Sequence, residues 1–454
     1  MNLKKVTSLT LTAFLLLSFF TGCAGEGAGS SSAPEPSSSD TADTFVPSQN
    51  KREPERIDYD ESTFPEVSVT AQHAEVVIER GDRTRPEQRL NDYFNFYENL
   101  SFASYTGYTS DPDYDGTTKM GVYNFDTKKF QQITTMNSYT ASTGSNVIME
   151  GRYHYIWWGG SELDENGKAV PYCSLYRTDA QDNTITIVET RDDVHFLSIG
   201  LSKLNEDTFI GISARWDGDM LAEGETKTTF LEKYDGKTGK REVIAQETFT
   251  CGETDRNSTG INIEQVTAID GTIYAFGRRR EDGVDKCYIY TYDENGNRLT
   301  ETEYPELYAG FDANTRLFYV FGDYYIIKSM EGLTDSLFKM EDGKLKLVFA
   351  YTRGNYFGSG FAGGMDSLYD SSRINYLYYM RNSEPSTIFA LNIHTDEITK
   401  LNIGIDDEYS KIAQFSVDEN GNMLIDLYKG EEMQDDQVYY LTAETLDQLI
   451  KSAS

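Results

Sequence analysis

The sequence has few residues of the types that most often carry enzyme chemistry. Only four histidines and four cysteines occur in 454 residues, and neither Gly-x-Ser-x-Gly nor His-Glu-x-x-His is present. Serine-nucleophile and zinc hydrolases therefore have no motif here to support them. Apart from Cys23, three widely spaced cysteines remain, which is no disulfide framework. We predict that Cys173, Cys251 and Cys287 are buried as small apolar side chains, and a Cys251–Cys287 bridge stays open as the alternative.

Positive charge, proline and long apolar helical runs are also scarce. Lys and Arg together number 41 against 74 Asp and Glu, which gives a formal net charge of −33. Such a charge disfavours nucleic acid and anionic surfaces as partners, and it also keeps a protein soluble. The 10 prolines, 32 tyrosines and 24 phenylalanines favour β-strands over helices.

The first 23 residues differ from the rest. Two lysines precede an apolar stretch over 9–20 that is too short to span a bilayer comfortably, a pattern typical of an export signal. The stretch ends in Phe20-Thr21-Gly22-Cys23, which resembles the lipobox of bacterial lipoproteins, although that family usually has Leu where Phe20 stands. The resemblance implies that residues 1–22 are removed and that Cys23 carries diacylglycerol and further acyl chains such as palmitate. A lipid anchor on the extracytoplasmic face of a bacterial cell membrane would follow; a plain secretory signal cut nearby is the alternative.

A linker follows the anchor. Residues 23–63 are rich in Ser, Gly, Pro and Glu and show no hydrophobic periodicity, so they bury too little apolar surface to fold. We expect a flexible spacer that reaches roughly 35 Å on average. The folded domain is then predicted to occupy residues 64–454.

One strand–turn–strand unit recurs along that domain. Its copies carry a turn residue at intervals of about 50 residues, and these turn residues are Asp126, Asp179, Asp235, Asp293, Asp342, Thr395 and Glu444. An earlier hairpin with an Asp-Gly, Gly-Asp or Asn-Gly turn precedes several copies, as in VTAIDGTIYAFG. Each unit therefore has four antiparallel strands, here named A to D in chain order, which is the blade of a β-propeller.

The sequence predicts an all-β, seven-bladed β-propeller of four-stranded antiparallel blades. The chain resembles bacterial β-propeller lipoproteins in this layout, but it lacks the signatures of the best-known propeller repeats. Two packed sandwiches are the alternative architecture. The segment PEVSVTAQHAEVVIE could add a strand to the last blade, and the terminal AETLDQLIKSAS could form a strand or a helical turn; either would close the ring.

Long B–C loops make one face of the predicted ring acidic. One of them contains Asp111, Asp113 and Asp115 before a glycine, which is similar to the hairpin calcium loops of integrin propellers. Alternating carboxylates that end in Gly suit weak Ca²⁺ binding, although the further acid of those loops is replaced by Lys119. A solvated acidic turn is the alternative to calcium.

Aromatic residues on the same predicted face suggest a binding surface. Trp158 and Trp216 end equivalent strands of adjacent units and are candidates to stack on a sugar ring or an aromatic peptide, with core packing as the alternative. Tyr356 and Phe357 lie in a glycine-rich connection and are further candidates for ligand contact.

These features lead to three functional hypotheses. The first is a non-catalytic, membrane-anchored extracytoplasmic lipoprotein whose propeller binds an extracellular glycan or protein. The second is an enzyme that acts on polysaccharide through acidic residues of the loop face, since paired carboxylates suffice for that chemistry. The third is a scaffold in a membrane-bound assembly. The first is the expectation that the sequence favours, with no catalytic residue assigned.

Overall fold

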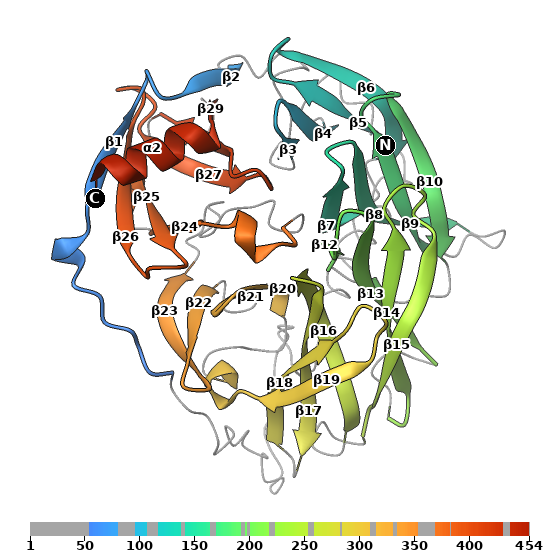
Figure 1. The fold of residues 1–454 in the computed structure, drawn as a ribbon. Coiled ribbons are helices and arrows are strands. Elements are labelled where there is room, and N and C mark those ends of the chain that lie inside the picture. The colour runs from blue at the N-terminus through green and yellow to red at the C-terminus, as the bar shows by residue number, and fades with distance from the viewer. Residues whose placement is uncertain are drawn as a thin grey trace, which may run out of the picture.

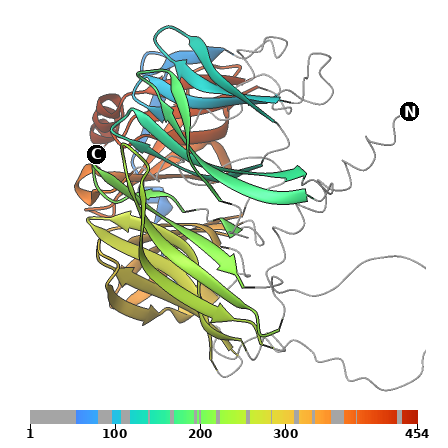
Figure 2. The same cartoon turned by 90° about the vertical axis from the view of Figure 1, so that its right-hand side faces the viewer.

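A computed structural model describes residues 54–79, 96–106, 117–137, 141–163, 169–191, 196–197, 200–217, 223–252, 258–281, 284–308, 315–329, 334–352, 368–381, 383–429 and 436–453. These segments form a ring of β-sheets that surround a common axis (Figure 1). Seen edge-on, the sheets stand side by side, and the C-terminal helix lies at one face of the ring (Figure 2). The all-β propeller fold is therefore confirmed.

The strands follow one another in sheets of consecutive hairpins. The first two sheets contain β3 (Phe96–Tyr97), β4 (Leu100–Thr106), β5 (Thr117–Asn124) and β6 (Lys129–Asn137), then β7 (Ala141–Met149), β8 (Tyr153–Leu163), β9 (Ala169–Asp179) and β10 (Thr184–Arg191). A larger sheet contains β11 (Phe196–Leu197), β12 (Ser202–Lys203), β13 (Thr208–Trp216), β14 (Thr226–Asp235), β15 (Arg241–Thr250), β16 (Thr259–Ile269), β17 (Thr272–Glu281), β18 (Val284–Tyr292) and β19 (Arg298–Glu303).

Three further sheets complete the ring. They contain β20 (Thr315–Phe321), β21 (Tyr324–Ser329), β22 (Thr334–Glu341) and β23 (Lys344–Thr352); β24 (Tyr376–Arg381), β25 (Glu384–Asn392), β26 (Ile398–Gly404) and β1 (Glu66–Thr70); and β27 (Lys411–Val417), β28 (Met423–Tyr428), β29 (Asp436–Leu441) and β2 (Glu75–Glu79). The helical elements are the 3₁₀ turns η1 (Glu61–Thr63), η4 (Pro305–Tyr308) and η6 (Ser371–Arg373) and the helix α2 (Ala443–Ala453).

The predicted number of seven separate blades is wrong. Five sheets have four strands each, and the residues expected to form the third and fourth blades form one nine-stranded sheet. The merger occurs because β15 pairs with β16, with Phe249 opposite Gly260 and Thr250 opposite Thr259. Gly260 has φ +92, and a Cβ built there would lie 2.1 Å from the carbonyl oxygen of Thr248, so only glycine permits this approach.

The N-terminal segment of the described domain closes the ring from outside. Residues 55–57 pair with the outer strand β23, where the Ile57 amide donates to the Leu347 carbonyl at 3.0 Å. The segment then adds β1, in parallel, to β26 and adds β2, antiparallel, to β29 (Figure 1). We call residues 54–79 the strap. The prediction that this segment supplies a strand to the last sheet is confirmed.

The C-terminus is a helix and supplies no strand. Glu444, predicted as a hairpin turn residue, lies in α2, whose Leu446, Leu449 and Ile450 are buried in the core. The four-residue spacing of the apolar side chains favours a helix over the alternation of a strand. Within the described residues, no helix is long and apolar enough to cross a membrane.

A β-bulge recurs in the outer strands. The extra residue is apolar each time: Ile133, Val188, Ile244, Leu299, Val348 and, in the strap's own strand, Val77. The pairing of β26 with β25 has no such shift, and β26 is the strand that accepts β1 along its whole length. The pairing of β29 with β28 is likewise free of a shift, and β29 accepts β2. Because bulges twist an edge away from further pairing, the regular edges of β26 and β29 are suited to take an added strand.

Aromatic packing and the repeated turns hold neighbouring sheets together. Tyr155 packs on Phe209 across a sheet boundary at a centroid distance of 4.6 Å, and Phe209 stacks on Tyr234 at 4.8 Å. The hydroxyl of Tyr155 donates to the carbonyl of Gly236, in the following C–D turn, at 3.0 Å. The hydroxyl of Tyr324 likewise donates to Asp396, so these turns serve as contacts between sheets.

A buried ion network joins the second sheet to the nine-stranded sheet. The Glu232 carboxylate is fully buried and accepts hydrogen bonds from Arg191 at 2.8 Å, Arg241 at 2.7 Å, Ser213 at 2.8 Å and Tyr234 at 2.6 Å. The four donors offset the cost of removing the carboxylate from water, so the network depends on the single negative charge at its centre.

We therefore expect Glu232→Gln to lower the free energy of unfolding by about 3–5 kcal/mol, because two arginines keep their charge without the buried counter-charge. Glu189→Gln is the matched control, since Glu189 also contacts Arg191 and Arg241 but is 23% exposed; its cost should be at most about 1 kcal/mol. Urea unfolding followed by fluorescence measures both. Equal losses in the two variants would contradict a central role for Glu232.

Candidate active site on the ring axis

The residues predicted from sequence to bind ligands do not come together in the described structure. Asp111, Asp113, Asp115, Tyr356 and Phe357 all lie outside the described residues. The proposed calcium loop is therefore untested, and within the described segments no group of three or more His, Cys, Asp or Glu residues is placed to hold a metal ion.

The tryptophans are part of the strands. Trp158 lies inside β8, opposite Ser174 of β9, and its side chain is outside the described part. Trp216 ends β13 and is only 6% exposed, which favours the core-packing alternative over a stacking role for this residue. The remaining cysteines behave as predicted: Cys173, Cys251 and Cys287 are buried and free, so the Cys251–Cys287 bridge is not formed.

A hollow lies at turns near the ring axis. It has a volume of about 520 Å³ and is lined by Tyr97, Glu150, Glu206, Arg373, Glu419 and Asn420. Most of these residues belong to the A–B hairpin turns that follow the inner strands, and Arg373 belongs to η6, drawn in orange near the centre of the ring (Figure 1). Because the inner strands surround the axis, their turns converge there.

Tight turns let the walls of the hollow approach one another. Gly151 has φ +60 in the β7–β8 turn, and a Cβ built on it would lie 2.3 Å from the ring of Tyr97 in the β3–β4 turn. Glu150, which precedes Gly151, also has a left-handed backbone conformation, with φ 52. The first and second sheets therefore meet closely at this end of the ring.

A fully buried lysine joins two glutamates of this site. The Lys203 Nζ lies 2.9 Å from Oε2 of Glu419 and 3.3 Å from Oε2 of Glu206, while the Lys203 side chain is 0% exposed. Its ammonium also lies 4.4 Å from the centroid of the Tyr369 ring. Lys203 comes from β12, Glu206 from the next turn and Glu419 from the β27–β28 turn, so one cation links opposite parts of the chain.

Glu206 is surrounded by donors. Its carboxylate accepts hydrogen bonds from the Tyr369 hydroxyl and, at 2.9 Å, from the Arg373 guanidinium. The hydrogen bond from Tyr369, followed by the charges of Lys203 and Arg373, lowers the pKa of Glu206 below its ordinary value despite some burial. Glu206 is therefore held ionised, and 53% of its side chain remains exposed.

Glu419 has the opposite environment. Its side chain is only 6% exposed, and burial raises the pKa of its carboxyl group above the ordinary value, although the charge of Lys203 acts in the other direction. The neighbouring Asp418 accepts backbone hydrogen bonds from Glu98 at 2.9 Å, Asn420 at 3.0 Å and Asn422 at 2.9 Å. Asp418 thus fixes the turn that carries Glu419.

The two glutamates form a pair with separated protonation behaviour. A carboxyl group whose pKa is raised beside one whose pKa is lowered is an arrangement that favours a proton donor and a negative charge in one site. Two exposed or half-buried charges flank them, Arg373 and Glu150, the latter paired with Lys237 at 3.1 Å. The arrangement suits acid–base chemistry on an uncharged group that enters the hollow.

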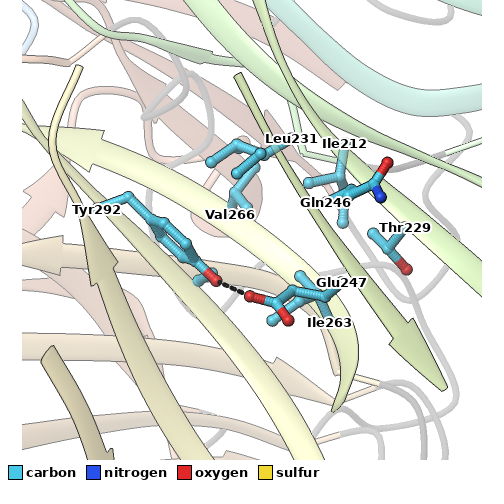
Figure 3. Close-up of a pocket in the computed structure, with 10 residues that line it drawn as sticks. Ile212, Thr229, Leu231, Gln246, Glu247, Ile263, Val266 and Tyr292 are labelled. Atoms are coloured by element: carbon cyan, nitrogen blue, oxygen red, sulfur yellow. Dashed lines mark hydrogen bonds between the residues drawn. The ribbon is translucent and has the colours of Figure 1, made fainter. Parts of the chain in front are cut away.

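A second, apolar gap lies between β13–β15 and β16–β18, away from this site. Its volume is only about 10 Å³, and the hydroxyl of Tyr292 closes it by donating to Glu247 at 3.0 Å (Figure 3). Such a space holds about one water molecule at most. It is a packing defect between strands and offers no room for a substrate.

Sequence reasoning missed this site because it placed binding on the long B–C loops. The site uses the opposite ends of the strands, where the A–B turns are short. One signal was present: Asn420-Gly421 is a turn dipeptide of the Asn-Gly kind, and the A–B turns of a propeller approach its axis. The ion pair between Lys203 and Glu419 joins residues 216 positions apart and has no local signature.

Comparisons with known proteins find similar solved structures, all at low sequence identity. No known protein-family model matches the chain, and no curated protein does. Among solved structures, oligogalacturonate lyase from Vibrio parahaemolyticus is 14% identical, with 82% of this chain and 97% of that chain covered and a TM-score of 0.44. The periplasmic gluconolactonase from Pseudomonas aeruginosa is 10% identical, with 72% and 92% covered and a TM-score of 0.40. The β-propeller domain of a protease from Pyrococcus furiosus, which has an open velcro topology, is 12% identical, with 66% and 81% covered and a TM-score of 0.38.

These comparisons correct one expectation. The solved structures include a lyase and a lactonase, so propeller neighbours of this chain are named as enzymes. The expectation of a non-catalytic binding domain, with enzyme activity disfavoured, is accordingly withdrawn. Likeness of this degree bears on the fold alone, so the case for catalysis here depends on the chain's own residues.

The opposite pKa shifts predict opposite effects of pH on stability. Folding raises the pKa of Glu419, so its contribution to the free energy of unfolding is complete below the unfolded pKa of 4.5 and is lost as pH rises through the raised pKa. Folding lowers the pKa of Glu206, so its contribution to the free energy of unfolding is present above pH 4.5 and is lost as pH falls below that value. Glu419→Gln should therefore flatten the decline of unfolding free energy above pH 4.5, and Glu206→Gln should flatten the decline below it.

Urea unfolding from about pH 3 to about pH 8 measures how the free energy of unfolding depends on pH above and below 4.5. Both variants keep the size of the side chain, so each serves as a control for the other. The same change in slope for both variants would contradict the assignment.

Proposed function

We propose that this protein is an enzyme that cleaves glycosidic bonds, with Glu419 as proton donor and Glu206 as the ionised carboxylate. The observation that carries the proposal is the pair of glutamates whose environments move their pKa values apart on the wall of the axial hollow. Glycoside cleavage is a reaction class that depends on two carboxyl groups in one site.

The dimensions of the hollow support a sugar ligand. A volume of about 520 Å³ lies in the range of roughly 300–1,000 Å³ that is typical of small-molecule sites. The Tyr97 side chain on its wall offers both an aromatic face and a hydroxyl group, which suits a sugar ring. Protonated Glu419 would donate to the glycosidic oxygen, while ionised Glu206 would stabilise positive charge at the anomeric carbon.

The substrate is expected to be uncharged at the bond that breaks. Both cations of the site are already engaged, Lys203 with Glu206 and Glu419, and Arg373 with Glu206. A net charge of −33 over the chain also disfavours anionic polymers.

Activity measurements on a polysaccharide panel test the proposal. Release of reducing ends should fall by about 10²–10⁴-fold in Glu419→Gln and in Glu206→Gln, the usual contribution of a catalytic acid or base. Glu301→Gln is the control: Glu301 lies on the outer strand β19, paired with Arg279 at 2.7 Å, and its loss should leave the rate unchanged. No cleavage of any polysaccharide by the wild-type protein, or full activity in both glutamine variants, would refute the function.

We further propose that the enzyme works at the extracytoplasmic face of a bacterial membrane, held by lipid on Cys23. The support is the charged start, the apolar stretch and the Gly22-Cys23 end of the leader, together with a linker before the strap. This location would place the axial site near extracellular polysaccharide.

Expression of the full chain in a bacterial host tests the anchor. The wild-type protein should partition into the detergent phase of a Triton X-114 extraction, and Cys23→Ala should move it to the aqueous phase, because two or more acyl chains are needed for stable attachment. Cys173→Ala is the control, as this buried thiol should not affect partitioning. Identical partitioning of wild type and Cys23→Ala would refute lipidation.

A further inference from the structure

We infer that the enzyme acts on the ends of glycan chains and on short oligosaccharides, and that it does not cleave bonds in the interior of a long chain. The inference rests on the proposed function and names the substrate class of that same site. It follows from a segment of backbone that reaches across the ring axis and closes one side of the hollow.

This segment consists of residues 369–373, which include η6, and we call it the bar. It leads into β24, and η6 lies near the centre of the ring between β24 and β12 (Figure 1). The bar is attached to a turn of the nine-stranded sheet: the Ser371 amide donates to the Asp270 carboxylate at 2.8 Å, and the Asp270 amide donates to the Tyr369 carbonyl at 2.8 Å. One sheet thus supplies the bar and another holds it.

Side chains of the bar fill the space between it and the β12–β13 turn. The Tyr369 hydroxyl donates to the Glu206 carboxylate, and the Tyr369 ring lies 4.4 Å from the Lys203 ammonium and 4.8 Å from the Arg373 guanidinium. Arg373 itself donates to Glu206 at 2.9 Å, and Tyr369 is only 9% exposed. No sugar ring fits between groups that are in contact at these distances, so the bar forms a closed end wall.

The floor of the hollow is closed as well. Glu419 lines the hollow but is only 6% exposed, and its partner Lys203 has no solvent contact. The Lys203 ammonium lies 2.9 Å from the Glu419 carboxylate. A chain that enters from the outer face therefore cannot continue past this ion pair along the axis.

The remaining walls come from one side of the axis. Tyr97, Glu150 and Asn420 belong to turns of the first, second and last sheets. Among the residues that the structure describes, none from the β20–β21 turn, on the far side of the bar, lines the hollow (Figure 1). The site is thus a pocket that ends at the bar, and it is not a groove that runs across the face.

The position of Glu206 limits the substrate. This carboxylate, proposed to act at the anomeric carbon, is held by the end wall itself, so the bond that breaks lies close to the bar. An internal bond of a polysaccharide has a long chain on both sides and needs a groove that is open at both ends. A chain end or a short oligosaccharide needs only the pocket, whose volume of about 520 Å³ is that of a small-molecule site.

The experiment measures the mode of cleavage on neutral soluble polysaccharides (arabinoxylan, galactomannan and mixed-linkage β-glucan) and on oligosaccharides derived from them. With the wild-type protein, reducing ends should accumulate while the viscosity of the polymer stays nearly unchanged. Chromatography should show mono- or disaccharides from the earliest time points. Cleavage in the interior of the chain would instead lower the viscosity at once and give long products first.

Loosening the bar should change this mode. Asp270→Gly removes the carboxylate that holds Ser371, and glycine suits the φ of 51 at this position, so the turn itself should fold. Combined with Asp370→Ala, which removes the side-chain cap of η6 at Ser372, it should raise the loss of viscosity per reducing end several-fold. Asp342→Gly is the matched control, because Asp342 has φ 53 in an Asp-Gly turn between β22 and β23, outside the site. It should cleave as the wild type does.

The outcomes separate the inference from the function on which it rests. An early fall in viscosity with the wild-type protein would overturn chain-end action and leave glycoside cleavage standing. A double variant that is folded by circular dichroism and still cleaves in the wild-type mode would overturn the assignment of the bar as the barrier. Absence of cleavage over all the polysaccharides and oligosaccharides would overturn the proposed function and the inference together.

Discussion

Closure of the ring by the strap is the constraint on which the site depends. The sheet that carries Glu419 would end at β29 if β2 did not pair with it, and the adjoining first sheet contacts this strand through Tyr123, whose hydroxyl donates to the Val77 carbonyl at 3.0 Å. The Asp418 carboxylate also crosses this boundary to the Glu98 amide. Closure therefore positions the turn of Glu419 beside the rest of the site.

The buried ammonium of Lys203 is the second determinant. A lysine without solvent contact is costly unless counter-charges and oriented groups surround it, and here two carboxylates and one aromatic face do so. The same contact that stabilises the lysine also fixes the separation of the two glutamates. Stability and site geometry are thus coupled in one interaction, and neither glutamate can shift far without exposing a buried charge.

Much of the fold could be predicted from sequence because it follows from local signals. Alternating apolar residues and Asp-Gly turns identified the hairpins, and the repeated spacing identified a propeller. The number of strands in each sheet was harder to predict, since the pairing of β15 with β16 depends on one close backbone contact at Gly260. Glu444 is not a hairpin turn residue, because the three-to-four residue periodicity around it forms a helix, the second of the two alternatives left open for this segment.

Of the candidate site, only the residue type could be anticipated from sequence. Paired carboxylates were named only as an alternative to non-catalytic binding and were placed on the B–C loop face, and their members could not be chosen from 74 acidic residues. What distinguishes Glu206 and Glu419 is burial and contact across 216 positions of sequence, from Lys203 to Glu419. The closed ring brings together residues that lie far apart in the sequence, so no local sequence signal marks these contacts.

The strap determines the order in which strand pairings bear a pulling force on the domain. A force applied from the N-terminal side reaches the residues paired with β23 first, then the parallel β1, and only last β2. The hydrogen bonds of β1 with β26 would be loaded together along the strand, while the pairing near Leu347 is short and would yield first. A tethered propeller built in this way could give up its outermost contact under tension while β2 keeps the ring closed and the axial turns in register.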